Sequence, residues 1–368
     1  MILTVELVGE RGATELVYVY LGSRLPDYAL SSVRMSAEAS GFPVRILANF
    51  PPPKNLPKEF NWTATESFYR EDAFKGFEGR SKLPASFREG FWLKTAERFF
   101  VLRDYFSQSK ATDFFHAELD VLVYSLDNLH HSLQTAGESG IFLPREADDR
   151  IVASLMYANS SDALDRLCDS LLERADCGNE MDILGSLTRN SAPWLHNFPT
   201  AEYLYRNREN RGLDFPWTIA AGTTGFVVDG AVLGRWLFGV DPRNTNFRGT
   251  RNMIQRQKDT VPFEFPLGQL LFRFDRGIQV LSVRHRDGPW FEIVAVHVHS
   301  KIHRKLSNAK ILKIVQRVNR LKDTVIVRRE FAFYRKYFSR IRKDLGLIAV
   351  SPSLLKGYAL RAGKRLWW

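Results

Sequence analysis

Two carboxylates spaced two residues apart stand inside an apolar stretch of this 368-residue chain. Glu118 and Asp120 are flanked by the runs Phe114-Phe115 and Val121-Leu122-Val123. In a strand, residues i and i+2 face the same side, and two unpaired carboxylates buried on one side repel each other at high cost. Bound Mg²⁺ or Mn²⁺, which prefer oxygen ligands, would remove that cost. The pattern predicts a metal site, although a hydrated strand end fits the same two residues.

Three further stretches place polar groups where a ligand could meet them. His297 and His299 share one face of an expected strand, which is also compatible with a surface strand end. Asp229 stands at an expected strand-to-helix turn, where doubly wound sheets bind ligands and where Asp also caps helices. Glu180 falls in the first turn of an expected helix, which the helix dipole favours for any acid.

Alternating strands and helices must position these groups. The strand–helix–strand start of the chain predicts an α/β fold with a doubly wound, mostly parallel sheet flanked by helices. The long polar and basic stretch 241–260 has no periodicity and is expected to be a loop able to act as a lid. Strands are expected at 17–21, 44–47, 113–124 (interrupted by its charges), 151–157, 225–228 and 291–299, a hairpin at 267–283, and helices at 26–39, 87–106, 161–187 (with a break at 177–179), 231–238, 306–321 and 329–345.

Several of these stretches, in this order along the chain, resemble GT-A-fold glycosyltransferases. Glu118-Leu119-Asp120 resembles the ExD variant of their metal-binding DxD motif, and the resemblance spans roughly residues 15–310. Arg235 departs from the pattern, which usually has Gln there. The other similar blocks are the helix before the motif (91–102), an acid before Met (179–184), an Asp-Gly with a following Gly-bearing helix and Gly-x-Asp-Pro-Arg loop (226–244), and a His-x-His-Ser-Lys segment (295–301).

The resemblance implies a metal-dependent transfer of a sugar from a nucleotide-diphosphate sugar to a hydroxyl of a glycan or lipid-linked acceptor. The cofactor would be Mn²⁺ or Mg²⁺, with Asp120 and His299 as ligands and His297 behind them. Glu118 would contact the donor ribose or a metal-bound water, and Lys301 the diphosphate. A non-catalytic protein of the same fold that binds nucleotide sugars or carbohydrates is the alternative, and a metal-dependent hydrolase stays open.

The remaining roles concern phosphates and the acceptor. Arg88 and Arg98, on the helix before the acidic motif, could donate to the donor phosphates. Arg98 fits equally well as the partner of a structural carboxylate. Glu180 and Asp229 are competing candidates for the general base that takes the acceptor proton.

Basic residues gather at the C-terminal end of a chain whose net charge is +11. The catalytic domain is expected at 1–322 and a basic amphipathic helical tail at 323–368. Phe331, Tyr334 and Phe338 segregate from Arg335 and its basic neighbours, so the tail could lie on an anionic membrane or dock on the catalytic domain. Because these rings do not alternate with the charges on one face, no nucleic-acid partner is expected.

Composition sets the expected compartment. Cys168 and Cys177 are the two cysteines, and without a CxxC pair they predict neither a disulfide framework nor a zinc site. The charged start of the chain does not resemble a signal peptide, and no apolar run approaches the ~20 residues of a membrane span. The expected location is cytoplasmic, with peripheral membrane attachment through the tail as an option.

Overall fold

A computed structural model describes residues 14–147, 150–189, 192–200, 225–238, 270–275, 279–285, 290–298 and 306–319. The chain divides into two units, Met1–Val318 and Asn319–Trp368. Apart from Asn319, the second unit lies outside the described residues, so the boundary expected near residue 322 and the amphipathic tail stay predictions. None of the described helices is long and apolar enough to cross a membrane.

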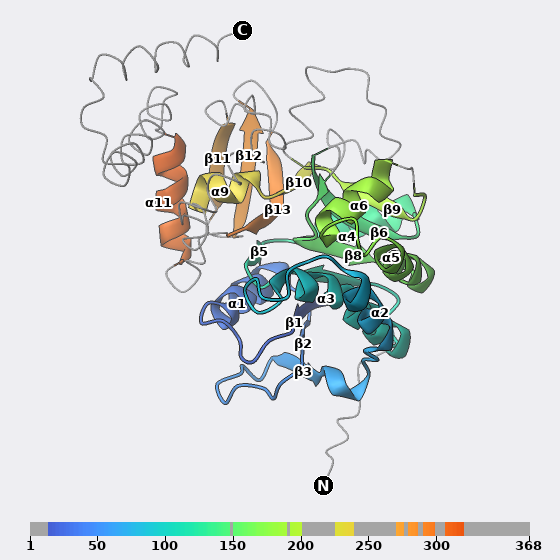
Figure 1. Cartoon of the computed structure of the whole chain (residues 1–368). Coiled ribbons are helices and arrows are strands. Elements are labelled where there is room, and N and C mark those ends of the chain that lie inside the picture. Colours follow the sequence, from blue (N-terminus) through green and yellow to red (C-terminus); the bar gives the residue numbers. More distant parts are fainter. Residues whose placement is uncertain are drawn as a thin grey trace, which may run out of the picture. The chain divides into compact units, whose positions relative to one another are not determined.

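The described part of the first unit has two sheets (Figure 1). The larger runs β3-β2-β1-β4-β8-β6-β7, with β9 on the other side of β6. Its members are β1 (Glu15–Tyr20), β2 (Val44–Ala48), β3 (Phe60–Ala64), β4 (Phe114–Ala117), β6 (Ile141–Ala147), β7 (Arg150–Ile151), β8 (Leu155–Ala158) and β9 (Leu195–Phe198).

The half of the larger sheet that contains β3, β2, β1 and β4 is parallel. Its order means that the chain moves outward from β1 to β3 and then returns to place β4 on the free side of β1. Ligands bind in such sheets at the carboxyl ends of the strands on either side of this reversal. The carboxyl end of β4 is therefore a site that topology alone would favour.

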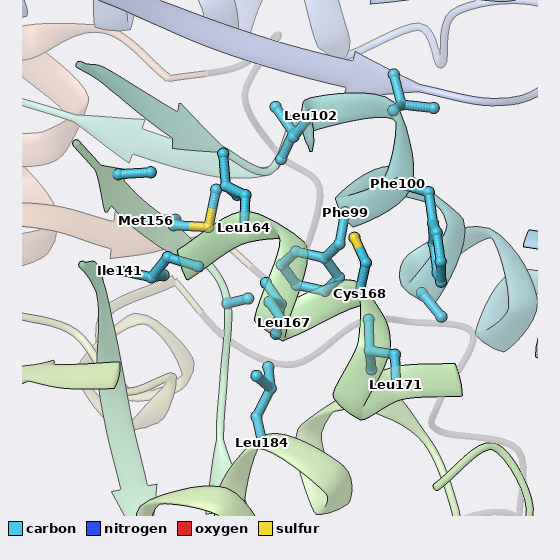
Figure 2. Close-up of a cluster of buried hydrophobic side chains, with 14 of the residues drawn as sticks. Phe99, Phe100, Leu102, Ile141, Met156, Leu164, Leu167, Cys168, Leu171 and Leu184 are labelled. Carbon is cyan, nitrogen blue, oxygen red and sulfur yellow. The ribbon is translucent and has the colours of Figure 1, made fainter. Parts of the chain in front are cut away.

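Helices cover both faces of the larger sheet because its strands are apolar on both sides. Alternate residues of β1 belong to different cores: Leu16 and Tyr18 pack with helices α1 and α4, and Val17 packs with α2, α3, α5 and α6. Figure 2 shows the second of these cores, in which Phe99 lies beside Leu167 and Cys168. The helices are α1 (Ala29–Ser40), α2 (Asp72–Arg80), α3 (Phe91–Gln108), α4 (Asp127–Ala136), α5 (Ser161–Glu173) and α6 (Glu180–Arg189), with a short 3₁₀ turn at Thr65–Ser67.

The smaller sheet runs β10-β13-β12-β11, with β5 on the other side of β13. Leu233, Phe272, Val296 and Ile311 are buried in its core, which helices α9 and α11 complete. The chain passes from the larger sheet to the smaller one between β4 and β5. The elements are β5 (Val121–Val123), β10 (Phe226–Val228), β11 (Leu270–Asp275), β12 (Val280–His285), β13 (Phe291–His297), α9 (Val232–Phe238) and α11 (Asn308–Asn319).

The expected α/β fold, with parallel strands flanked by helices, is confirmed. The sheet continues beyond β4 through antiparallel strands, and the second sheet was not expected. The strand expected over 113–124 is two strands in two sheets, because a turn at Leu119-Asp120 separates them. The loop expected at 241–260 lies outside the described residues.

Candidate active site

The acidic pair lies in a turn at the carboxyl end of β4. The turn is closed by the Val121 N–H, which donates to the Glu118 carbonyl oxygen at 3.0 Å. The Glu118 N–H donates to the Ser154 carbonyl oxygen at 3.1 Å, which ties the turn to the chain before β8. Glu118 and Asp120 thus stand between the two sheets, with Asp120 buried and Glu118 partly exposed.

β13 brings an imidazole to this turn. His297 pairs with Val121 of β5 in antiparallel register, and the Val298 N–H donates to the Asp120 carbonyl oxygen at 2.7 Å. His297 Nε2 consequently lies 2.9 Å from Asp120 Oδ2 and 3.6 Å from Glu118 Oε2. The two segments expected to form the site, although far apart in sequence, are side by side.

The three side chains fit a divalent cation. One ligand-type atom each from Glu118, Asp120 and His297 lies within 4.8 Å of the others. Two carboxylate oxygens and one imidazole nitrogen are a donor set that suits Mn²⁺ or Mg²⁺. A cation would also relieve the repulsion between the two neighbouring carboxylates.

Arg98 of α3 links the acidic turn to a second buried acid. Its guanidinium pairs with Glu118 through Nη1 and lies 3.7 Å from Glu180 Oε1 through Nη2. Thr95 Oγ1, one helical turn earlier, is 2.9 Å from Glu180 Oε2. Because Arg98 and Glu180 are both buried, each stabilises a charge that would otherwise be costly to desolvate.

Asp229 holds the backbone of the site. Its Oδ1 accepts from the Leu233 N–H at 2.9 Å, which caps the start of α9. Its Oδ2 accepts from the Gly234 N–H at 2.9 Å and from the His297 N–H at 3.0 Å. The helix-capping role that the sequence left open is present, and the same carboxylate fixes the strand that carries His297.

Gly234 allows α9 to touch β13. A Cβ at this position would lie 2.7 Å from the carbonyl carbon of His297 and 2.8 Å from Asp229 Oδ2, closer than real Cβ atoms approach such groups. Any other residue would therefore push α9 away from β13. Asp229, Gly234 and His297 form one contact that sets the position of the imidazole.

Burial changes the acid–base behaviour of the groups around the cluster. Desolvation raises the pKa of Glu180, with Arg98 and Thr95 opposing the change. Desolvation also raises the pKa of Asp229, although the three backbone N–H groups that donate to its carboxylate act to lower it. Burial, and secondarily Arg98, lowers the pKa of His116 on β4 to about 3, so this imidazole is neutral and its Nδ1 donates to the Val17 carbonyl oxygen at 3.0 Å.

No protein-family model matches this sequence, and no curated protein matches it. Several solved structures have a similar chain course. Mouse xyloside xylosyltransferase 1 in its apo form has a TM-score of 0.36 and 8% sequence identity, covering 51% of this chain and 85% of that one. The galactosyltransferase LgtC with donor and acceptor sugar analogues has a TM-score of 0.37 and 13% sequence identity, covering 55% of this chain and 81% of that one. The glycosyltransferase GlyE of Streptococcus pneumoniae TIGR4 has a TM-score of 0.30 and 12% sequence identity, covering 57% of this chain and 53% of that one.

These three proteins are glycosyltransferases, the class that the sequence resembles. At such scores the likeness settles neither the family nor the activity of this chain.

The predicted site residues fall into three groups. Glu118, Asp120, Arg98 and Glu180 come together, and Asp229 joins them through the His297 N–H. Arg88 lies in the turn before α3, with its guanidinium 5.2 Å from the ring centre of Phe87. His299 and Lys301 lie outside the described residues, as does the side chain of Arg235.

Two further residues belong to the candidate site. The cluster contains His297, which was expected to stand behind His299. Thr95, which was not singled out, contacts Glu180 from the same face of α3 as Arg98. Its three-residue spacing from Arg98 was a signal for this, since residues three apart are neighbours on a helix.

Proposed function

We propose that this chain is a metal-dependent glycosyltransferase that moves a sugar from a nucleotide-diphosphate sugar to a hydroxyl of a glycan or lipid-linked acceptor. The meeting of Glu118, Asp120 and His297 at the carboxyl end of β4 carries the proposal. This place combines a cation-binding donor set with the strand reversal at which sheets of this kind bind ligands. The resemblance of the acidic turn to an ExD motif agrees with it.

The chemistry requires that negative charge on a departing nucleoside diphosphate be stabilised. Mn²⁺ or Mg²⁺ held by Asp120 and His297 would neutralise that charge as a Lewis acid. Glu118, held by Arg98, would contact the same ion through a water or accept from the donor ribose. His299, Lys301 and Arg88 stay proposed as further ligands of the ion and the phosphates.

Geometry favours Glu180 over Asp229 as the general base. Both oxygens of Asp229 accept backbone N–H groups, so this acid is committed to positioning His297 and α9. Glu180 is held by the side chains of Thr95 and Arg98, and burial raises the pKa of its carboxyl group, which makes the carboxylate a stronger proton acceptor. Glu180 would take the proton of the acceptor hydroxyl, while Arg98 holds the Glu180 carboxylate in place.

A thermal-shift screen of UDP, GDP, CDP and their hexose conjugates, with Mn²⁺ or with EDTA, tests this function. We expect at least one of these ligands to raise the unfolding temperature with Mn²⁺ and to have no effect with EDTA, because the diphosphate binds through the ion. Product analysis with a mixture of oligosaccharide acceptors follows for the ligand that binds.

The outcomes separate the alternatives. Transfer to an acceptor supports the proposal. Metal-dependent binding without turnover indicates the non-catalytic protein, and sugar release at one rate with or without acceptors indicates a hydrolase. The absence of any metal-dependent shift across the panel would count against all three.

A further inference from the structure

Phe87, Phe91 and Trp92 form an aromatic rim at the start of α3. Phe87 and Phe91 are 39% and 38% exposed, and among the described residues they are the two large hydrophobic side chains on the surface. The rings contact one another: Phe91 and Trp92 meet edge to face at 4.9 Å, and Phe87 lies parallel to Trp92 at 6.2 Å. Exposed apolar groups gathered in this way mark interaction sites more often than scattered ones.

An uncommon backbone turn builds the rim. Arg88, Glu89 and Gly90 all have positive φ, at 49°, 57° and 78°. Three consecutive left-handed residues, two of them not glycine, are unfavourable unless the surroundings hold them. The turn folds Phe87 back onto Trp92, and Arg88 lies over the Phe87 ring. The fold thus maintains an exposed pair of rings at the expense of local strain.

The rim is continuous with the candidate active site. Trp92, Thr95 and Arg98 follow one another at three-residue steps along α3, and Thr95 and Arg98 contact Glu180. At about 1.5 Å per residue, Trp92 and Arg98 are ~9 Å apart along the helix. Trp92 also packs on Val152, Met181 and Ala231, and Met181 directly follows Glu180. The rim therefore lies on the side of Glu180 away from the acidic turn.

We propose that the aromatic rim is the acceptor subsite, and that it stacks against the apolar face of a pyranose ring of the acceptor glycan. This inference rests on the proposed glycosyltransferase function. The C–H groups on one face of a pyranose carry partial positive charge, and the faces of aromatic rings carry partial negative charge. A sugar seated on Phe87 and Phe91 would direct a hydroxyl along α3 toward Glu180, while the exposed Glu89 remains at the edge to bind its other hydroxyls.

The test compares the double variant Phe87→Ala/Phe91→Ala with Phe87→Tyr/Phe91→Tyr, which keeps the ring faces. Saturation-transfer NMR and calorimetry would measure binding of lactose, maltotriose, cellotriose and chitotriose to the full chain. We expect the wild type to bind at least one of these sugars. The alanine variant should bind it about tenfold more weakly, and the tyrosine variant within about twofold of the wild type.

Mn²⁺-dependent binding of the nucleotide diphosphate, measured on the same variants, should not change, which shows that the alanine variant is folded. Wild-type sugar affinity in the alanine variant, or no sugar binding by the wild type, would overturn the subsite. So would a wild-type dimer that the alanine variant dissociates, because the rim would then be a contact between copies. If the wild type shows no metal-dependent binding of a nucleotide diphosphate, the proposed function itself is refuted.

Discussion

His297 is held from its backbone as well as through its ring. Its N–H donates to Asp229, and its ring lies beside Asp120. Its carbonyl group packs against Gly234. A ligand position needs this kind of support, because a small displacement of one donor weakens metal binding.

Replacing Gly234 by alanine tests this support. We expect Gly234→Ala to destabilise the fold by about 2 kcal/mol, since the methyl group overlaps the His297 carbonyl and α9 must move. Mn²⁺ affinity should fall in the same variant. Thermal unfolding and a Mn²⁺ titration measure the two effects.

Gly79→Ala is the matched control. Gly79 also lies in a helix, but a Cβ there meets nothing within 4 Å. This variant should be at least as stable as the wild type and bind Mn²⁺ normally. Equal behaviour of the two variants would contradict the close contact between α9 and β13.

The residues of the site could be predicted from sequence only in part. Glu118 and Asp120 were found because two acids inside an apolar run require a partner. Both histidines fall on one face of the expected strand, and the resemblance favoured His299 over His297 as the ligand; the described cluster contains His297, and His299 lies outside the described residues. The distance of His297 from Asp120 depends on the register between β5 and β13, which pairs His297 with Val121.

Helix α6 positions Glu180 as its first residue. Asn179, just before it, is buried, and its Oδ1 accepts from the N–H groups of Met181 at 3.0 Å and Asp182 at 3.2 Å. This cap fixes the first turn of the helix, and with it the direction of the Glu180 side chain. The same helix start supplies Met181 to the contact with Trp92.

Removing the cap separates stability from activity. Asn179→Ala and Ser160→Ala each remove a helix cap, because Ser160 Oγ accepts from the Ala163 N–H at the start of α5. We expect each to cost about 1 kcal/mol of unfolding free energy. Only Asn179→Ala should lower turnover, about tenfold or more, since only that cap orients Glu180.

Urea unfolding and initial rates with saturating donor measure these effects. Equal loss of activity in both variants would attribute it to general destabilisation. Unchanged turnover in Asn179→Ala would remove Glu180 from the reaction.

Across the whole molecule, local patterns predicted the first sheet better than the second. The strand–helix–strand start was correct because β1, α1 and β2 are neighbours in sequence and in space. The smaller sheet escaped prediction because it pairs β5 with β13, some 170 residues later in the chain. Such distant pairing leaves no periodic signal in either segment.

The charge distribution of the molecule also bears on the site. The chain is basic overall, at +11, yet the cluster at the junction of the sheets is acidic. The basic residues near the C-terminus lie mostly outside the described residues, so membrane attachment stays a prediction. The local acidity is a property of the site, and it would favour binding of a cation there.

Calorimetric titration of the nucleoside diphosphate found in the screen, in the presence of Mn²⁺, tests the central claim most directly. Asp120→Asn should abolish the Mn²⁺-dependent binding while leaving the unfolding temperature within a few degrees of the wild type. Asp162→Asn changes the chain's charge equally at an exposed position of α5 and should bind normally. Wild-type affinity in Asp120→Asn would contradict a cation held by Asp120 with Glu118 and His297.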